Sequence, residues 1–178
     1  MAKKTKGVRD SDAAGDEIDA IQLLTSQHRE VDKLFQDLKN ASDETVMRST
    51  LLQVVDKLTA HTTIEERHFY PVVRGAETED IVADAFDDHH EVKEMCLHLL
   101  DVGPGDEDFH AKVEELQALV EEHVAIEEGE LFPQVRELYD VDQLQTMGRE
   151  MAASLAELEE IGEPRQQLIA DLGEDARK

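Results

Sequence analysis

The chain has 178 residues, enough for one domain with a hydrophobic core, and it carries a formal net charge of −25. So acidic a surface repels nucleic acid and anionic lipid, and we expect neither as a partner. With Cys96 as its single cysteine, the chain cannot form an internal disulfide framework or a cysteine-based zinc site.

Residues 1–17 are polar and show no apolar period, so we interpret them as a disordered tail. This stretch has a basic start and no apolar centre, which is typical of neither a signal peptide nor an anchor. No apolar run approaches the roughly 20 residues that a membrane-spanning helix needs. We therefore expect a cytoplasmic protein without a membrane partner.

Four helical patterns follow the tail, each with apolar side chains recurring at a period near 3.6. They cover about residues 18–40, 42–73, 79–101 and 107–138. The loops between them are short, and no run has the pattern of a strand. The sequence therefore predicts an all-α fold, an antiparallel up-and-down four-helix bundle over residues 18–138.

A fifth amphipathic segment, about residues 141–161, follows the predicted bundle. Pro164 and Gly173 interrupt the pattern beyond it. We predict one additional C-terminal helix and a tail within residues 139–178. This helix is where we expect a protein partner, if the chain has one.

The chain repeats itself at an interval of 61 to 62 residues. The first and third helical patterns share His-x-Glu-Val, which begins at His28 and again at His89. The second and fourth share His-x3-Glu followed by an aromatic-proline pair, over residues 61–71 and 123–133. Each repeat predicts a helical hairpin, and two hairpins give four helices related by a pseudo-twofold axis.

The repeated polar residues interrupt the apolar faces of the predicted helices. Residues four apart lie roughly 40° apart around a helix, so each His-x3-Glu motif presents an imidazole and a carboxylate on one side. Buried carboxylates among imidazoles need a compensating positive charge, which a metal centre supplies. The candidate metal ligands are His28, His61, Glu65, His89, His123 and Glu127.

On the third helix, either of two adjacent histidines could be the ligand. His90 lies about 100° from His89, among charged residues, so His89 is the preferred candidate. Glu66 and Glu128 follow the candidate glutamates and are interpreted as surface acids or as acids that support the site from outside. The Tyr-Pro and Phe-Pro pairs at 70–71 and 132–133 are interpreted as packing and kink devices.

This arrangement resembles the hemerythrin-like, HHE cation-binding family over about residues 18–138. The resemblance implies a non-haem centre of two iron ions, with terminal histidines, and with Glu65 and Glu127 bridging the irons beside an oxo or hydroxo group. Oxygen-carrying members have a fifth histidine where this chain has Lys93. The set of four histidines and two glutamates therefore implies that one iron has a more open coordination sphere. Zinc or manganese would also suit these donors.

We expect a protein that binds or reacts with small oxidants: oxygen, hydrogen peroxide or nitric oxide. Catalase-like removal of peroxide is one such activity. The alternative is an iron- or oxygen-responsive sensor without turnover, and a metal-free interaction bundle is a third hypothesis.

Overall fold

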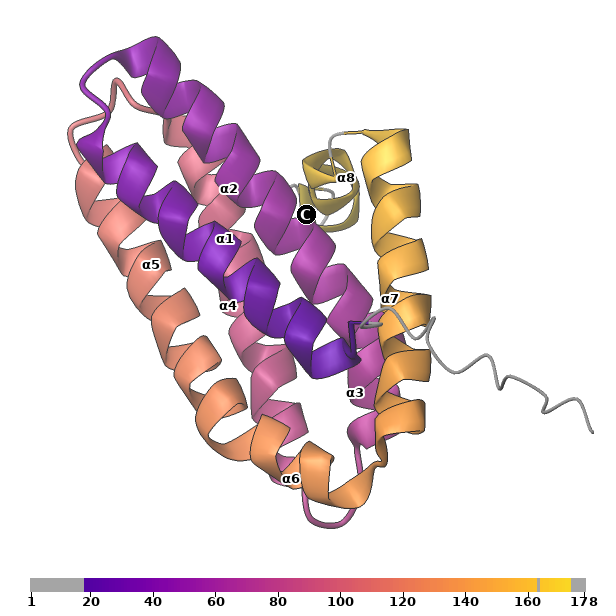
Figure 1. Cartoon of the computed structure of the whole chain (residues 1–178). Coiled ribbons are helices and arrows are strands. Elements are labelled where there is room, and N and C mark those ends of the chain that lie inside the picture. The colour runs from indigo at the N-terminus through magenta and orange to yellow at the C-terminus, as the bar shows by residue number, and fades with distance from the viewer. Residues whose placement is uncertain (1–17, 163, 174–178) are drawn as a thin grey trace, which may run out of the picture.

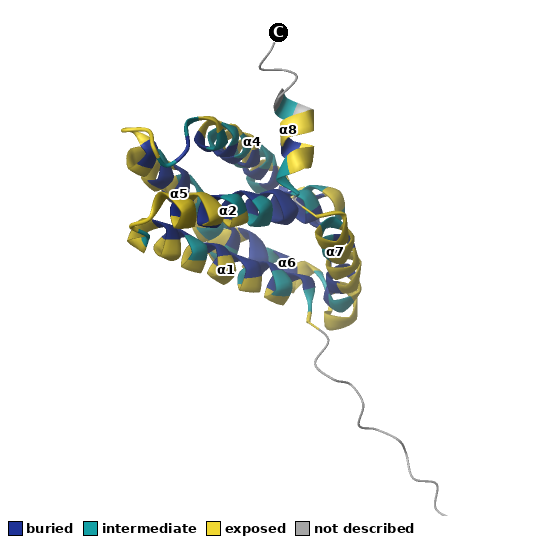
Figure 2. Cartoon of the chain, turned by 90° about the horizontal axis from the view of Figure 1, so that it is seen from above, coloured by how far each residue is buried: buried dark blue, intermediate teal, exposed yellow. Residues whose placement is uncertain are grey.

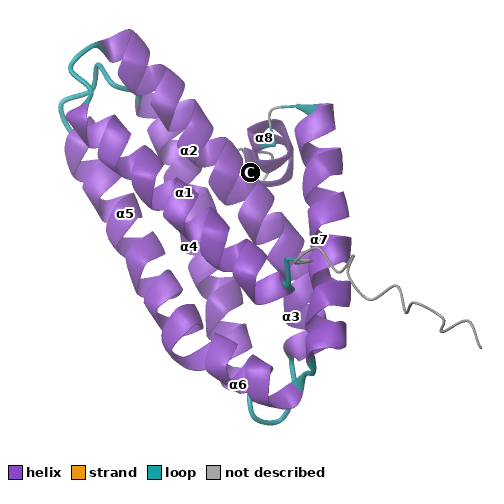
Figure 3. Cartoon of the chain, in the orientation of Figure 1, coloured by secondary structure: helices purple, strands orange, loops and turns teal. Residues whose placement is uncertain are grey.

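The computed structural model describes residues 18–162 and 164–173. Within these ranges the regular structure is helical and contains no strand, as Figure 3 shows. The predicted all-α bundle with an extra C-terminal helix is thereby confirmed. The prediction of a disordered tail over residues 1–17 lies outside the described residues.

Four long rods make up the bundle (Figure 1). The first and third are the single helices α1 (Ala20–Asn40) and α4 (Glu79–Val102). The second consists of α2 (Glu44–Ile64), the π-helical turn η1 (Glu65–Phe69) and α3 (Tyr70–Val73). The fourth consists of α5 (Phe109–Ile126), the π-helical turn η2 (Glu127–Leu131) and α6 (Phe132–Leu138). α1 packs against α2 and α4 against α5, so the two hairpins follow the sequence repeat.

Local chemistry explains where the rods begin and end. Asp19 forms a capping box with Gln22, in which each side chain accepts a hydrogen bond from the backbone N–H of the other. Asp43 caps α2 by accepting from two backbone N–H groups of its first turn. Gly103 ends α4 with a φ of 69°, a conformation that a glycine adopts without strain.

Two C-terminal helices pack on the outside of the bundle. α7 (Val141–Ile161) lies along α1, α2 and η1, and its Gly148 lies against the backbone at residues 18–20. A Cβ atom at Gly148 would lie 2.5 Å from the carbonyl oxygen of Ile18, so only glycine fits there. The sequence pattern predicts one C-terminal helix, whereas the structure adds α8 (Arg165–Gly173), which packs on α2 and α4. Pro164 precedes this helix instead of ending one, which suits a residue without a backbone N–H.

The apolar core has two parts with a polar layer between them. Figure 2 shows the buried residues on the inner faces of the rods. Along α1, Leu24 belongs to one cluster and Val31 to the other, with His28 between them. Along α2, Leu58 and Ile64 belong to different clusters in the same way. The repeated histidines therefore lie at one level, where the core changes from one apolar cluster to the next.

None of the helices in the described ranges combines the length and the apolarity that crossing a bilayer requires.

Candidate metal centre

The structure brings all six candidate ligands together in the polar layer. Each is at most 6% exposed. Their nitrogen and oxygen atoms form two groups, in each of which the atoms lie within 4.8 Å of one another. The first group is His28, His61, Glu65 and Glu127, and the second is Glu65, His89 and His123.

Of the two adjacent histidines on α4, His89 lies in the cluster and His90 does not. The side chain of His90 is 59% exposed, and its ring lies 3.5 Å from Glu94 at the surface. The geometry thus separates two residues between which helical periodicity only states a preference.

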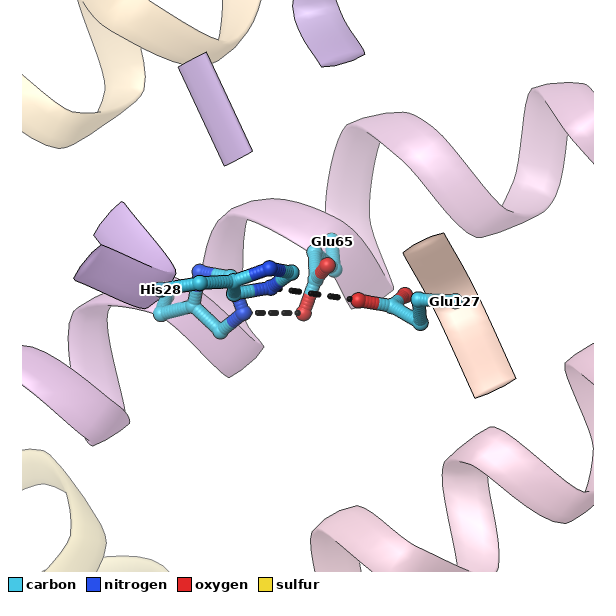
Figure 4. Close-up of side chains that lie close together, drawn as sticks. His28, Glu65 and Glu127 are labelled. Atoms are coloured by element: carbon cyan, nitrogen blue, oxygen red, sulfur yellow. Dashed lines mark ion pairs between the residues drawn. The ribbon is translucent and has the colours of Figure 1, made fainter. Parts of the chain in front are cut away.

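Each glutamate lies between one histidine of each pair. Oε2 of Glu65 is 3.1 Å from Nε2 of His61 and 3.3 Å from Nε2 of His89. Oε2 of Glu127 is 3.3 Å from Nε2 of His28 and 3.6 Å from Nε2 of His123. Figure 4 shows His28, Glu65 and Glu127 close together, with the ion pair between His28 and Glu127 dashed. This is the placement that two bridging carboxylates between two metal ions require.

A π-helical turn begins at each of these glutamates. The backbone N–H of Tyr70 bonds to the carbonyl of Glu65, and that of Phe132 to the carbonyl of Glu127, five residues back in both cases. The prolines at 71 and 133 follow directly; they lack an N–H and would clash in a regular helix. The wider turns accommodate them, and they also change which later residue faces the centre.

Every candidate histidine is held from outside by a hydrogen bond at Nδ1. Such partners fix the ring orientation and leave Nε2 facing inward as a lone-pair donor. The bonds are His28 to Glu128 at 2.8 Å, His61 to Gln27 at 3.0 Å, His89 to Glu66 at 2.9 Å and His123 to Asp88 at 3.2 Å.

Two of these outer acceptors follow the candidate glutamates, as the sequence suggested, and two were missed. Gln27 and Asp88 each directly precede a histidine of the repeat, at an interval of 61 residues. That matching position was the available signal. The two halves differ in charge, because a neutral amide stands at Gln27 where the other half has the carboxylate of Asp88.

Five inward-facing atoms of the cluster lack hydrogen-bond partners. These atoms are Nε2 of His28 and of His61, both carboxylate oxygens of Glu65, and Oε2 of Glu127. Burying such atoms without a partner is costly, and proteins rarely do so. Imidazole and carboxylate donors without thiolate suit iron, manganese or zinc, so the residues fit a pair of metal ions.

Electrostatics in the metal-free protein point the same way. Burial and the charge of Glu127 raise the pKa of Glu65 well above its ordinary value. Burial and the neighbouring His28 lower the pKa of His61. Burial also opposes ionisation of Glu127, but the contact with His28 and the charge of His123 outweigh it and lower the pKa of Glu127. The layer therefore lacks positive charge around Glu65, which bound cations would supply.

Tyr70 is a site residue that the sequence interpretation placed among the packing devices. Its buried hydroxyl donates to Oε1 of Glu127 at 2.9 Å and lies 3.2 Å from Nε2 of His89. The equivalent residue of the other half, Phe132, instead stacks on His28 with ring centroids 6.0 Å apart. The Tyr–Phe mismatch within the repeat was the signal, and it makes the two candidate metal positions chemically different.

Known proteins resemble this chain in sequence and in fold. The family model described as hemerythrin HHE cation binding domain matches residues 19–135. A similar solved structure is a hemerythrin HHE cation binding domain-containing protein, an Rv2633c homologue from Mycobacterium kansasii. It superimposes with a TM-score of 0.71 at 20% identity, covering 79% of this chain and 87% of that one. A curated relative, a DNA nickase from Nostoc sp. (strain PCC 7120), is 26% identical over 138 residues; the alignment covers 78% of this chain but only 39% of the nickase.

Proposed function

Because the chain belongs to the hemerythrin HHE cation-binding family, we propose that it holds two iron ions between its six donor side chains and that this centre binds or reacts with small oxidants. The candidates are oxygen, hydrogen peroxide and nitric oxide. The observation that carries the proposal is the set of buried ring nitrogens and carboxylate oxygens that face inward without hydrogen-bond partners. Iron, when bound, supplies redox chemistry and open coordination positions.

The side chains have distinct parts in this proposal. His28 and His61 would hold one ion, His89 and His123 the other, and the two glutamates would lie between the ions. The acceptors at the Nδ1 atoms keep the rings in place. Tyr70 holds a proton on its hydroxyl oxygen beside the second position, because burial and the charges of the two glutamates raise its pKa well above the ordinary value.

A small cavity beside the histidines, here called the inner chamber, supports a small reactant. Its volume is about 20 Å³, which is close to the space that one water molecule occupies. Its walls are the four candidate histidines, Gln27, Thr62 and five apolar side chains: Val31, Leu58, Val92, Val120 and Val124. A chamber of this size suits a small reactant.

The first test is metal stoichiometry in a pair of adjacent variants. The wild-type protein should bind two equivalents of iron. His89→Ala should lose at least one of them, because it removes a buried donor. His90→Ala is the matched control, since its ring is exposed, and it should keep both. Less than one equivalent in the wild-type protein, or equal binding by both variants, would refute the proposed site.

The second test is turnover. Iron-loaded protein should evolve oxygen from hydrogen peroxide, and His61→Ala should abolish that activity. An unchanged rate in the variant would assign the activity to loosely bound iron.

A sensor is the second candidate, and one contact favours it. α7 packs against η1, the turn that begins at the candidate ligand Glu65. Iron binding at Glu65 could therefore alter the packing of α7. Limited proteolysis should then cleave within residues 141–161 more readily in the metal-free protein than in the iron-loaded one, whereas identical digestion patterns would reject this candidate.

Cleavage of DNA is not part of the proposal. The similarity to the nickase covers 39% of that protein, and the net charge of −25 opposes binding to phosphates.

A further inference from the structure

Two surface grooves of the bundle correspond to each other under the pseudo-twofold relation. The first, of about 200 Å³, lies between α1 and α5, and the second, of about 280 Å³, between α2 and α4. Their linings match across the repeat: Glu128 and Ala125 in the first groove correspond to Glu66 and Thr63 in the second. A symmetric bundle would offer both grooves as equivalent paths to the centre.

Among the described residues, only the first groove shares walls with the inner chamber. His28, Val120 and Val124 line both the groove and the chamber. No residue that lines the second groove also lines the chamber. The side chains of His28, Val120 and Val124 therefore separate the first groove from the inner chamber.

The valines of α5 are also less buried than their counterparts. Val120 and Val124 are half-buried, whereas the equivalent residues of α2, Leu58 and Thr62, are 4% and 2% exposed. The barrier between solvent and the chamber is therefore thinner on the α5 side.

Helix α8 packs over the second groove and forms one of its walls. Leu168 and Leu172 of α8 form part of its lining, and Leu168 is buried in the core. Asp56 of α2 holds the start of α8, because it accepts a hydrogen bond from the backbone N–H of Arg165 at 3.0 Å and pairs with its guanidinium group. Figure 1 shows α8 on the α2 side of the bundle, away from α5. The C-terminal segment thus covers one of two otherwise equivalent faces.

The first groove also contains an unpaired polar atom. Gln117 is 9% exposed and donates from its amide nitrogen to Glu121 at 2.6 Å. Its amide oxygen is buried without a partner. The carboxylate of Glu121 can only accept, so it cannot serve as a partner for this oxygen.

Resting on the proposed function, we propose that small oxidants reach the metal centre through the α1–α5 groove, and that Val120 and Val124 control their passage. Val124 is the residue to test first, since it lines both the groove and the inner chamber and is next to the candidate ligand His123 in sequence. α8 closes the equivalent approach, so access is from one side.

The experiment measures how fast nitric oxide binds to the reduced, iron-loaded protein by stopped-flow absorbance. Val124→Phe should slow binding about tenfold, and Val124→Ala should accelerate it, within the range that association rates span among related variants. Thr63→Phe is the matched control: it fills the second groove and should leave the rate unchanged. Iron content is measured for each variant, so that loss of metal is not taken for a slow rate.

A redox-inert centre separates this proposal from the proposed function. Azide binding to the cobalt(II)-loaded protein is followed by the visible bands of cobalt, and the order of rates among the three variants should be the same. If the iron-loaded protein neither binds nor reacts with oxidants, but the azide-binding rates of the variants follow the predicted order, the proposed function is wrong and the proposed route is supported. If Thr63→Phe slows both probes and the Val124 variants change neither, the route is wrong. A protein that binds neither metal overturns both proposals.

Discussion

The two glutamates of the centre should affect the stability of the metal-free protein in opposite directions. Glu65 has both carboxylate oxygens buried without a hydrogen-bond partner. Glu127 accepts a hydrogen bond from Tyr70 at 2.9 Å and is stabilised in its charged form by His28 and His123. Replacing each by glutamine, the neutral isostere of the protonated acid, tests this difference.

The size of each effect follows from the contacts. Burying a carboxylate without a hydrogen-bond partner costs at least about 1–3 kcal/mol, and neutral glutamine avoids the part of this cost that comes from the charge. Hydrogen bonds to charged groups contribute about 1.5–3 kcal/mol. For a chain of this length, 1 kcal/mol moves Tm by about 2–4 °C. At pH 7, Glu65→Gln should therefore raise Tm of the metal-free protein by about 2–12 °C, and Glu127→Gln should lower it by about 3–12 °C.

The pH dependence of unfolding provides a second test of the direction in which each substitution changes stability. The folded-state pKa of Glu65 is raised above the ordinary value of 4.5, so its contribution to stability is fully present below that value and is lost as the pH rises through the folded pKa. The gain from Glu65→Gln should thus be smaller at pH 5 than at pH 7. The folded-state pKa of Glu127 is lowered, so its stabilising contribution is present above 4.5 and lost as the pH falls through the folded pKa.

Thermal unfolding of chelator-treated protein, followed by circular dichroism, measures both variants. Added iron should then stabilise the wild-type protein by about 2.7 kcal/mol at a hundredfold excess over Kd, and Glu65→Gln by less. A fall in Tm for Glu65→Gln at pH 7, or shifts of the same sign for both variants, would refute the reasoning.

Three other substitutions test the packing and the support of the centre. Gly148→Ala should lower the free energy of unfolding by about 1–3 kcal/mol, because a Cβ there would overlap the backbone at the start of α1. Gly129→Ala, with no atom within 4 Å of the added Cβ, should change it by less than about 1 kcal/mol, and denaturant titration compares the two. Asp88→Asn removes the charged acceptor on His123 and should weaken iron binding about 10- to 100-fold in a chelator competition. Tyr70→Phe should destabilise the metal-free protein by about 1–3 kcal/mol in thermal unfolding, since its hydroxyl bonds to a buried carboxylate.

The helices of the bundle and the residues of its polar layer could be predicted from the amino-acid pattern alone. Apolar side chains at a period of 3.6 are a local signal, so the predicted segment 141–161 coincides with α7 and the other rods agree within two residues. The repeat added the register, because two copies of one hairpin place equivalent residues at the same level. It named all six residues that the structure brings together, and preferred His89 over His90.

The contacts around the six candidate ligands could be known only from the folded chain. The π-helical turns at Glu65 and Glu127 break the 100° count on which helical periodicity depends, so the inward hydroxyl of Tyr70 could not be inferred by counting residues. The bond from His28 to Glu128 joins positions 100 residues apart. The place of α8 over one groove likewise depends on long-range packing. Such contacts depend on which helices face each other across the bundle, and this cannot be inferred from a local sequence pattern.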